Sequence, residues 1–418
     1  MTASHLAWLI CLIATAGVIL RPLRWPEAVW ACGGAALIVL LGLLPIPAAL
    51  HAIGEGTDVY LFLIGMMLLS EIARREGLFD WIAAYAVNHA HGSTTRLFVL
   101  VYMLGVGVTA LLSNDATAVV MTPAVFAVAR KANAPALPLL LICALVANAA
   151  SFVLPISNPA NLVLYGNHMP PLGAWLRSFA LPSLLSIAAT FALLWLTQRR
   201  HLGGRCNQAL QIPPLSTHGR IALASIVVTA LVLLAVSALD MRLGLPTAIL
   251  GVLTLLIVCA QQRSAPWPVL RDISWSVLPL VAGLFVLVQV LDHTGVIHTL
   301  ASWLVTQTQA NAPRAAAFAA AAIGLGSNAI NNLPAGLIAS SSLTQAHSPS
   351  AVVDAVLIAV DLGPNLSVTG SLATILWRGA LRREGMSVSF WQFFKVGLAV
   401  MPPALLLAVG ARLWLGQF

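Results

Sequence analysis

Charged side chains are scarce in this sequence, because only 8% of its 418 residues are Asp, Glu, Lys or Arg. A soluble domain carries about 25% charged residues. Hydrophobic residues make up 60% of the chain, and a single water-facing globule of this length cannot bury that much apolar surface. The composition therefore disfavours a soluble enzyme, a nucleic-acid-binding protein and a disordered chain.

Several chemical signatures are also missing. The five cysteines form no CxxC pair, and four of them lie in apolar runs, so neither a disulfide framework nor a zinc site is indicated. No G-x-x-x-x-G-K-[ST] sequence is present, so the chain is not expected to hydrolyse ATP. No nucleophile–base arrangement or metal-ligand spacing indicates an enzyme, and no cofactor is expected. The start of the chain lacks a signal-peptide pattern, so its first apolar run is expected to stay as a helix.

Long apolar runs are what the sequence has instead, and many approach the roughly 20 residues that span a bilayer. They predict helices near 5–20, 27–44, 58–73, 178–198, 221–239, 245–261, 273–291 and 396–414, and an amphipathic surface helix at 78–91. Four further apolar regions are interrupted by polar residues: 97–129, 136–165, 315–342 and 351–377.

The order of these segments repeats along the chain. We expect a first repeat over 1–198, a basic cytoplasmic linker over 199–219 and a second repeat over 220–418. Each repeat would hold five transmembrane helices and one re-entrant hairpin (97–129 and 315–342), with one broken helix at the membrane midplane (136–165 and 351–377). An odd number of spans per repeat makes the second repeat inverted. The predicted fold is therefore an all-α polytopic membrane protein built from two inverted repeats.

The basic residues predict the orientation, since Lys and Arg collect in cytoplasmic loops. With both termini outside the cytoplasm, only four of the 21 basic residues fall outside, which leaves 21 − 4 = 17 on the cytoplasmic side. The four exceptions are Arg177, Arg242, Arg314 and Arg412.

The four interruptions are where a functional site is expected. Irregular backbone at membrane depth is tolerated only inside protein or beside a water-filled cavity, and paired interruptions in two repeats indicate a transport site. The polar residues there include Ser113, Asn114, Asp115, Thr117, Ser157, Asn158, Asn161, Ser327, Asn328, Asn331, Asn332, Asp361, Asn365, Ser367, Thr369, Ser371 and Thr374. No Lys, Arg or His lies in any interruption. A small neutral polyhydroxy solute or a cation therefore fits better than an anion.

Asp115 and Asp361 are the two carboxylates that this topology places deep in the membrane. Ionisable residues there are costly and mark functional sites. They are candidates for coupling to protons or sodium, although an Asp at a break can also cap a half-helix.

The segments SNDATAVVMTPAV (113–125), ISNPANLV (156–163), NNLPAGLI (331–338) and DLGPNLSVTGSLATILW (361–377) resemble ArsB-type arsenite and antimonite efflux permeases. These permeases belong to the ion-transporter superfamily that includes sodium/proton antiporters and divalent-anion/sodium symporters. The resemblance implies export of arsenite and antimonite in exchange for protons, across the cell membrane. It implies a substrate site at Asn114, Thr117, Ser157, Asn158, Asn161, Asn331, Asn332, Asn365, Ser371 and Thr374, with Asp115 and Asp361 coupling to protons.

The residues agree with that substrate, because arsenite is mostly an uncharged trihydroxide near neutral pH. The chain departs from the family at Asn148, where an Asp can occur, and this places more weight on Asp115 and Asp361. A sodium/proton antiporter, a sodium-coupled anion importer and a membrane subunit that needs a soluble ATPase partner stay open as alternatives. The oligomeric state, including a homodimer, is not determined by the sequence, and no nucleic-acid partner is expected.

Overall fold

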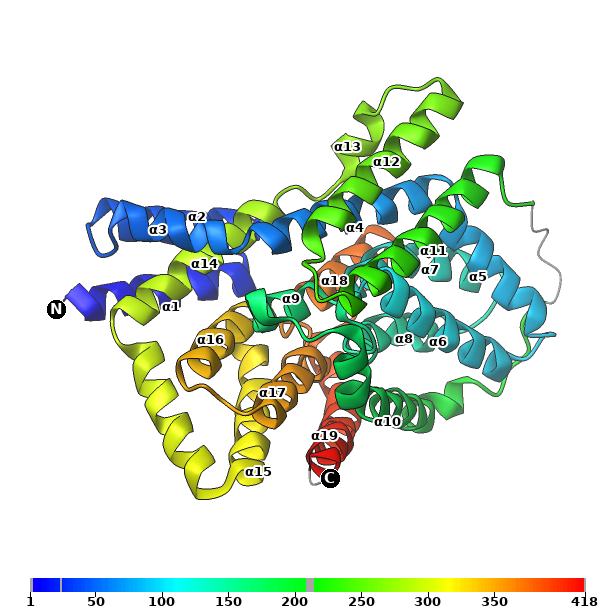
Figure 1. The fold of residues 1–418 in the computed structure, drawn as a ribbon. Coiled ribbons are helices and arrows are strands. Elements are labelled where there is room, and N and C mark those ends of the chain that lie inside the picture. Colours follow the sequence, from blue (N-terminus) through cyan, green and yellow to red (C-terminus); the bar gives the residue numbers. More distant parts are fainter. Residues whose placement is uncertain (1–2, 23–24, 208–213, 417–418) are drawn as a thin grey trace.

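The structure is a computed structural model that describes residues 3–22, 25–207 and 214–416. Arg24, which was counted as cytoplasmic above, and residues 208–213 of the predicted linker lie outside the described residues. The described chain is helical and contains no β-strand (Figure 1). In its first half the helices are α1 (Ala3–Leu20), α2 (Glu27–Leu40), α3 (Ile46–Glu55), α4 (Thr57–Arg75), α5 (Leu78–His89), α6 (Thr94–Leu111), α7 (Thr122–Lys131), α8 (Ala136–Ala149), α9 (Pro159–Tyr165) and α10 (Leu172–Gln198).

The second half follows the same order. Its helices are α11 (Thr217–Ala238), α12 (Gly244–Gln262), α13 (Trp267–Asp272), α14 (Val277–His293), α15 (Val296–Ile330), α16 (Asn332–Gln345), α17 (Ser350–Leu362), α18 (Leu372–Arg383) and α19 (Phe390–Leu415). Short turns fill the breaks: a π-helical turn over Ala116–Met121, and 3₁₀ turns over Pro155–Ser157 and Gly363–Leu366. The all-helical class predicted from the apolar runs is confirmed.

Three helical segments were not expected from the sequence. These are α3, α13 and the first part of α15, which precedes a kink at Asn311 where φ is −164° and ψ is 99°. The side-chain Oδ1 of Asn311 accepts from the N–H of Arg314 at 2.9 Å, so Asn311 caps the second part of α15. Predicted helix 27–44 is also shorter, because α2 ends at Leu40 and a turn with Gly42 at φ +69° follows.

Six described helices are long and apolar enough to cross a membrane, or up to eight if each of two bent pairs is one span. The bent pairs are α3 with α4, at 46°, and α14 with α15, at 71°. Two shorter helices, α2 and α8, are also apolar. With 19 residues, α4 is about 28 Å long, close to the thickness of a bilayer core. These lengths and compositions make the chain a multi-pass membrane protein.

Helices of the first half of the chain pack directly against helices of the second half. α4 of the first half lies along α12 of the second, α2 lies along α14, and α10 lies beside α19 (Figure 1). The contact between α4 and α12 requires glycine, because a Cβ on Gly65 would lie 2.1 Å from the carbonyl oxygen of Thr247. The crossing therefore brings the two backbones together as closely as small residues allow in membrane helices.

The broken helices occupy the interior. Every residue of α8 from Pro138 to Ala149 is buried, and so is every residue of α17 from Asp354 to Leu362. The irregular backbone that follows each helix is thereby kept away from lipid, which is the condition for such backbone at membrane depth.

Loops that the charge pattern assigns to one side of the membrane contact one another. At the basic end of α4, Arg75 forms an ion pair with Asp272 of α13 at 2.7 Å. At the other end of α4, Oδ1 of Asp58 accepts from the N–H of Gly244, the first residue of α12, at 3.0 Å. The grouping of loop ends predicted from the basic residues is therefore consistent with these contacts.

Candidate functional site

Four helix starts meet around one small cavity of about 20 Å³. α9 begins after Asn158, α16 begins at Asn332, α18 begins after Ser371, and the π-helical turn begins after Asp115. Two of these starts come from each half of the chain. Helix N-termini carry a partial positive charge, although the first N–H groups of α9 and α16 already bond to Asn158, Asn331 and Gly370 or are missing at the prolines that follow.

Five of the twelve predicted site residues line this cavity: Asn114, Asp115, Asn158, Asn332 and Ser371. The remaining wall is mostly apolar and includes valine and leucine side chains of α4 and α14. No Lys, Arg or His is among the described residues that line the cavity. The polar groups of all four sequence interruptions are therefore brought to one place, without a side-chain cation.

Two cavity residues present hydrogen-bond acceptors that no protein group uses. Asn114 and Asn332 are 4% and 3% exposed, and the Oδ1 atom of each has no partner among the described residues. An unsatisfied buried carbonyl oxygen is costly, and such an atom at a cavity is a position for a ligand that donates a hydrogen bond.

Asp361 lies behind the cavity wall and reaches it through one side chain. The Nδ2 group of Asn158 donates to Oδ1 of Asp361 at 2.7 Å, and the two residues come from different halves. Asp361 is fully buried, and its Oδ2 atom has no partner among the described residues. Asp361 is therefore joined to the cavity lining by one hydrogen bond, which Asn158 donates.

The other predicted residues of the first half hold the irregular backbone in place. Thr117 lies 2.8 Å from Thr109 across the hairpin, measured between the two Oγ1 atoms. Ser157 donates to the carbonyl of Ala110 at 3.1 Å, and the Nδ2 group of Asn161 donates to backbone carbonyls of the break at 3.0 to 3.4 Å. These three side chains do not line the cavity.

The second half shows the same division. Asn331 caps α16 through its Oδ1 atom, and Thr374 completes a capping box with Ser371 at the start of α18. Asn365 accepts from the Nδ2 group of Asn148 at 3.0 Å, which joins the two broken helices. Asn148, singled out in the sequence only as a departure from a family pattern, is therefore a contact between the two halves.

One buried ion pair, between Arg412 and Asp354, was not predicted from the sequence. Arg412 of α19 donates through Nε to Oδ2 of Asp354 at 2.6 Å, and Tyr165 at the end of α9 donates to the other carboxylate oxygen. Asp354 and Arg412 are 3% and 6% exposed. The signal was available, since Asp354 is an ionisable residue inside an apolar run.

Interrupted helices from both halves of the chain, meeting at a polar cavity inside a bundle of apolar helices, define a membrane transporter. Comparison with known proteins identifies the family within this class. Residues 10–363 match the family model described as Citrate transporter (CitMHS), and the chain belongs to that family.

Relatives are similar along nearly their whole length. The arsenical pump membrane protein of Yersinia enterocolitica is 25% identical over 399 residues, which cover 90% of this chain and 91% of the relative. That of Escherichia coli K12 is 26% identical over 403 residues, with the same coverage. An uncharacterized transporter of Mycobacterium tuberculosis is 26% identical over 432 residues, with 98% of each chain covered.

One solved structure has the same fold. The YdaH transporter of Alcanivorax borkumensis, described as having an unusual topology, superposes with a TM-score of 0.58 and 16% identity. The superposition covers all of this chain and 99% of the other. The resemblance to ArsB-type permeases inferred from sequence motifs is confirmed at the level of the family.

Proposed function

We propose that this chain exports arsenite and antimonite, as neutral trihydroxides, across the cell membrane in exchange for protons. The proposal rests on one observation, the hydrogen-bond donors and acceptors that line the cavity. Asn114 and Asn332 present unused acceptors, Asp115 adds a carboxylate, and the side-chain amides and the Ser371 hydroxyl supply donors. A metalloid trihydroxide has three O–H donors and three oxygen acceptors, and it matches both kinds of group. The arsenical pump relatives support the same substrate.

Proton exchange would pass through the two carboxylates. Asp115 lines the cavity, and Asp361 reaches it through Asn158. One proton moving down roughly 150 mV releases about 3.5 kcal/mol. That free energy sustains a gradient of about 300-fold in a neutral solute, so efflux would need no ATP. In this proposal both termini and the ends of α4, α9, α14 and α16 that lie away from Arg74 and Arg75 are extracytoplasmic.

Anion uptake is the second candidate, because the family model is described as a citrate transporter and four helix starts could hold carboxylates. Against it, an anion in the cavity would lie beside Asp115 with no Lys, Arg or His to offset the charge. Ionised citrate has only one hydroxyl to donate, so it would leave at least one of the acceptor oxygens of Asn114 and Asn332 unused.

The test is flux in proteoliposomes that contain only this chain, with an imposed pH gradient and without sodium or ATP. We expect uphill arsenite movement that an uncoupler abolishes. The Asp361→Asn variant should lose uphill movement, while Asp80→Asn, an exposed carboxylate on α5, should keep it.

Three other results would refute the proposal. Citrate uptake without arsenite movement would favour the anion reading. Sodium-dependent proton flux without arsenite movement would favour a sodium/proton antiporter. Arsenite movement that requires an added ATPase would make the chain a pump subunit.

A further inference from the structure

A second and larger cavity lies next to the candidate site. Its volume is about 300 Å³, and its walls come from the ends of α3, α4, α9, α14 and α16. We call it the vestibule. Val59 of α4 lines both the vestibule and the substrate cavity, so the two are separated by little more than one side chain.

The vestibule lies at the end of the bundle away from the basic loops. Asp58 lies at the start of α4, about 25 Å along the helix axis from Arg74 and Arg75 at its other end, and Glu55 ends α3 just before it. Asp292, near the end of α14, lies in the vestibule wall as well. By the positive-inside pattern this is the extracytoplasmic end.

The charges that face the vestibule are mainly negative. Glu55, Asp58 and Asp292 line it, and no Lys or Arg is among the described lining residues. Neutral or weakly basic groups hold these carboxylates: Oδ1 of Asp292 accepts from Gln345 at 2.6 Å, Asp58 accepts from a backbone N–H, and Glu55 lies 3.6 Å from a histidine ring of its own helix. They are therefore positioned without being neutralised by a guanidinium group inside the vestibule.

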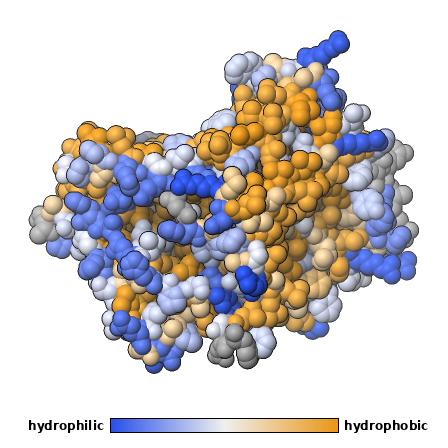
Figure 2. Space-filling view, viewed as in Figure 1, coloured by the Kyte–Doolittle hydropathy of each residue, from blue (hydrophilic) through white to orange (hydrophobic). Residues whose placement is uncertain are grey.

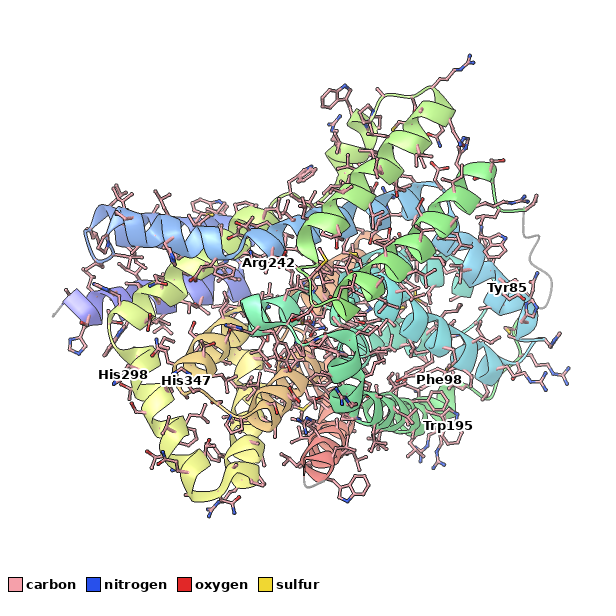
Figure 3. The ribbon with its side chains drawn as sticks, in the orientation of Figure 1. Tyr85, Phe98, Trp195, Arg242, His298 and His347 are labelled. Atoms are coloured by element: carbon pink, nitrogen blue, oxygen red, sulfur yellow. The ribbon has the colours of Figure 1, made fainter. Side chains whose placement is uncertain are left out.

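The imidazole of His168 is also in the vestibule wall, and the guanidinium of Arg242 lies outside the vestibule but close enough to interact with Asp58. Arg242 lies in the segment between α11 and α12 and lines an adjoining cavity with Asp240, a cavity that shares Asp58 with the vestibule (Figure 3). The surface over α14, α15 and α16 is rich in hydrophilic residues, whereas that over α11 and α12 is hydrophobic (Figure 2).

We propose that the vestibule is the extracytoplasmic mouth of the transport path and that its carboxylates select by charge, admitting neutral hydroxides and cations and rejecting oxyanions. The proposal rests on the proposed transport function for its direction, but its geometry stands on the two adjacent cavities. A cleft with charges of one sign and low-dielectric walls focuses the potential, so three carboxylates act on any solute that passes between the outside and the site at Asn332 and Asp115.

The experiment measures the accessibility and charge preference of a thiol placed in the vestibule. Ser341 of α16 lines the vestibule and is replaced by Cys, in a background that carries Cys32→Ser because the other four native cysteines are buried. Right-side-out and inverted membrane vesicles are treated with two membrane-impermeant methanethiosulfonates of similar size, one cationic and one anionic. Ser264→Cys, an exposed position beyond α12 at the basic end, is the sidedness control.

We expect Ser341→Cys to react in right-side-out vesicles and Ser264→Cys in inverted ones. After correction for the reaction of each reagent with a free thiol, the cationic reagent should react faster with the vestibule thiol. Asp292→Asn should lower this cationic-to-anionic ratio at least about threefold, and Glu55→Gln should lower it in the same direction. Glu384→Gln, an exposed carboxylate at the opposite end, should leave it unchanged.

The charge selection would be overturned if the cationic-to-anionic ratio were near one in the Ser341→Cys protein. It would also be overturned if neither Asp292→Asn nor Glu55→Gln changed that ratio. Reaction of Ser341→Cys only in inverted vesicles would overturn the extracytoplasmic placement. None of these measurements needs arsenite flux, so a protein that labels as expected but moves no arsenite would refute the proposed substrate and leave the vestibule assignment standing.

Discussion

The hydrogen bond between Asn158 and Asp361 joins the two halves of the molecule at the candidate site, and it can be tested by exchanging its partners. Asn158 donates to Asp361 at 2.7 Å and also caps α9 by accepting from the N–H of Ala160 at 3.0 Å. A hydrogen bond to a charged group contributes about 1.5–3 kcal/mol, and an N-cap contributes about 1 kcal/mol. Asn158→Ala loses both and should cost about 2.5–4 kcal/mol of folding free energy.

Exchanging the two side chains separates the contribution of the Asn158–Asp361 hydrogen bond from that of the N-cap. Asn158→Asp keeps the cap but sets two carboxylates within hydrogen-bond distance and removes the donor, so we expect it to be the least stable variant. Asp361→Asn leaves an amide that Asn158 can still bond, and should be close to the parent protein. The double variant Asn158→Asp with Asp361→Asn restores one donor and one carboxylate with the cap intact, and should recover most of the loss.

The assay is thermal unfolding of the purified proteins in one detergent, with Asp80→Asn on the exposed face of α5 as the matched control. Arsenite flux in proteoliposomes then separates stability from coupling. If Asp361 carries the proton, the Asp361→Asn protein keeps downhill movement of arsenite but loses uphill movement. An exchanged double variant that is no more stable than Asn158→Asp alone would show that the two side chains do not pair, and the reasoning would fail.

Three further outcomes follow from individual contacts. Arg412→Gln leaves Asp354 buried without its ion-pair partner and should cost about 3–5 kcal/mol in thermal unfolding, with partial recovery when Asp354→Asn is added; an unchanged midpoint would contradict the buried pair. Asn332→Ala removes an unused acceptor at the cavity and should weaken arsenite binding, measured by calorimetry, about 3- to 10-fold without lowering the unfolding temperature, whereas equal affinity would remove this residue from the site. The hydrogen bond from Arg75 holds the pKa of Asp272 below its ordinary value of about 3.9, so this contact of α13 is present above that pH and is lost only as the pH falls through the lower, folded-state value. Hydrogen exchange of α13 should therefore be similarly protected at pH 7 and pH 5, and release of α13 between these values would be inconsistent with the pairing.

Breaks inside apolar runs were the most predictable feature of the fold. The run Asp361-Leu362-Gly363-Pro364-Asn365 predicted an interruption, and a 3₁₀ turn occupies Gly363–Leu366. The first broken helix behaves in the same way, since Asn158 and Pro159 start α9 after a turn. Glycine, proline and short polar residues give the backbone alternatives to the helix, and that effect is local enough to be read from sequence.

Segments that depend on packing were missed. α3 and α13 have ten and six residues, too short for helical propensity alone to make them stable. α13 is instead held by the ion pairs of Asp272 with Arg74 and Arg75 across a long sequence separation. The bond between Asn148 and Asn365 and the ion pair of Arg412 likewise join residues whose proximity no local pattern encodes.

The sequence by itself determined the class of protein, the approximate position of each break and the amide, hydroxyl and carboxylate chemistry available there. Only the tertiary structure decided how those groups are used. Asn114, Asp115, Asn158, Asn332 and Ser371 face one cavity, while residues of the same types at the same breaks, such as Thr117 and Asn161, bond to the protein itself. The physical reason is that such side chains can satisfy a nearby carbonyl as readily as a ligand, and only the packing of the two halves fixes which of them is left facing open space.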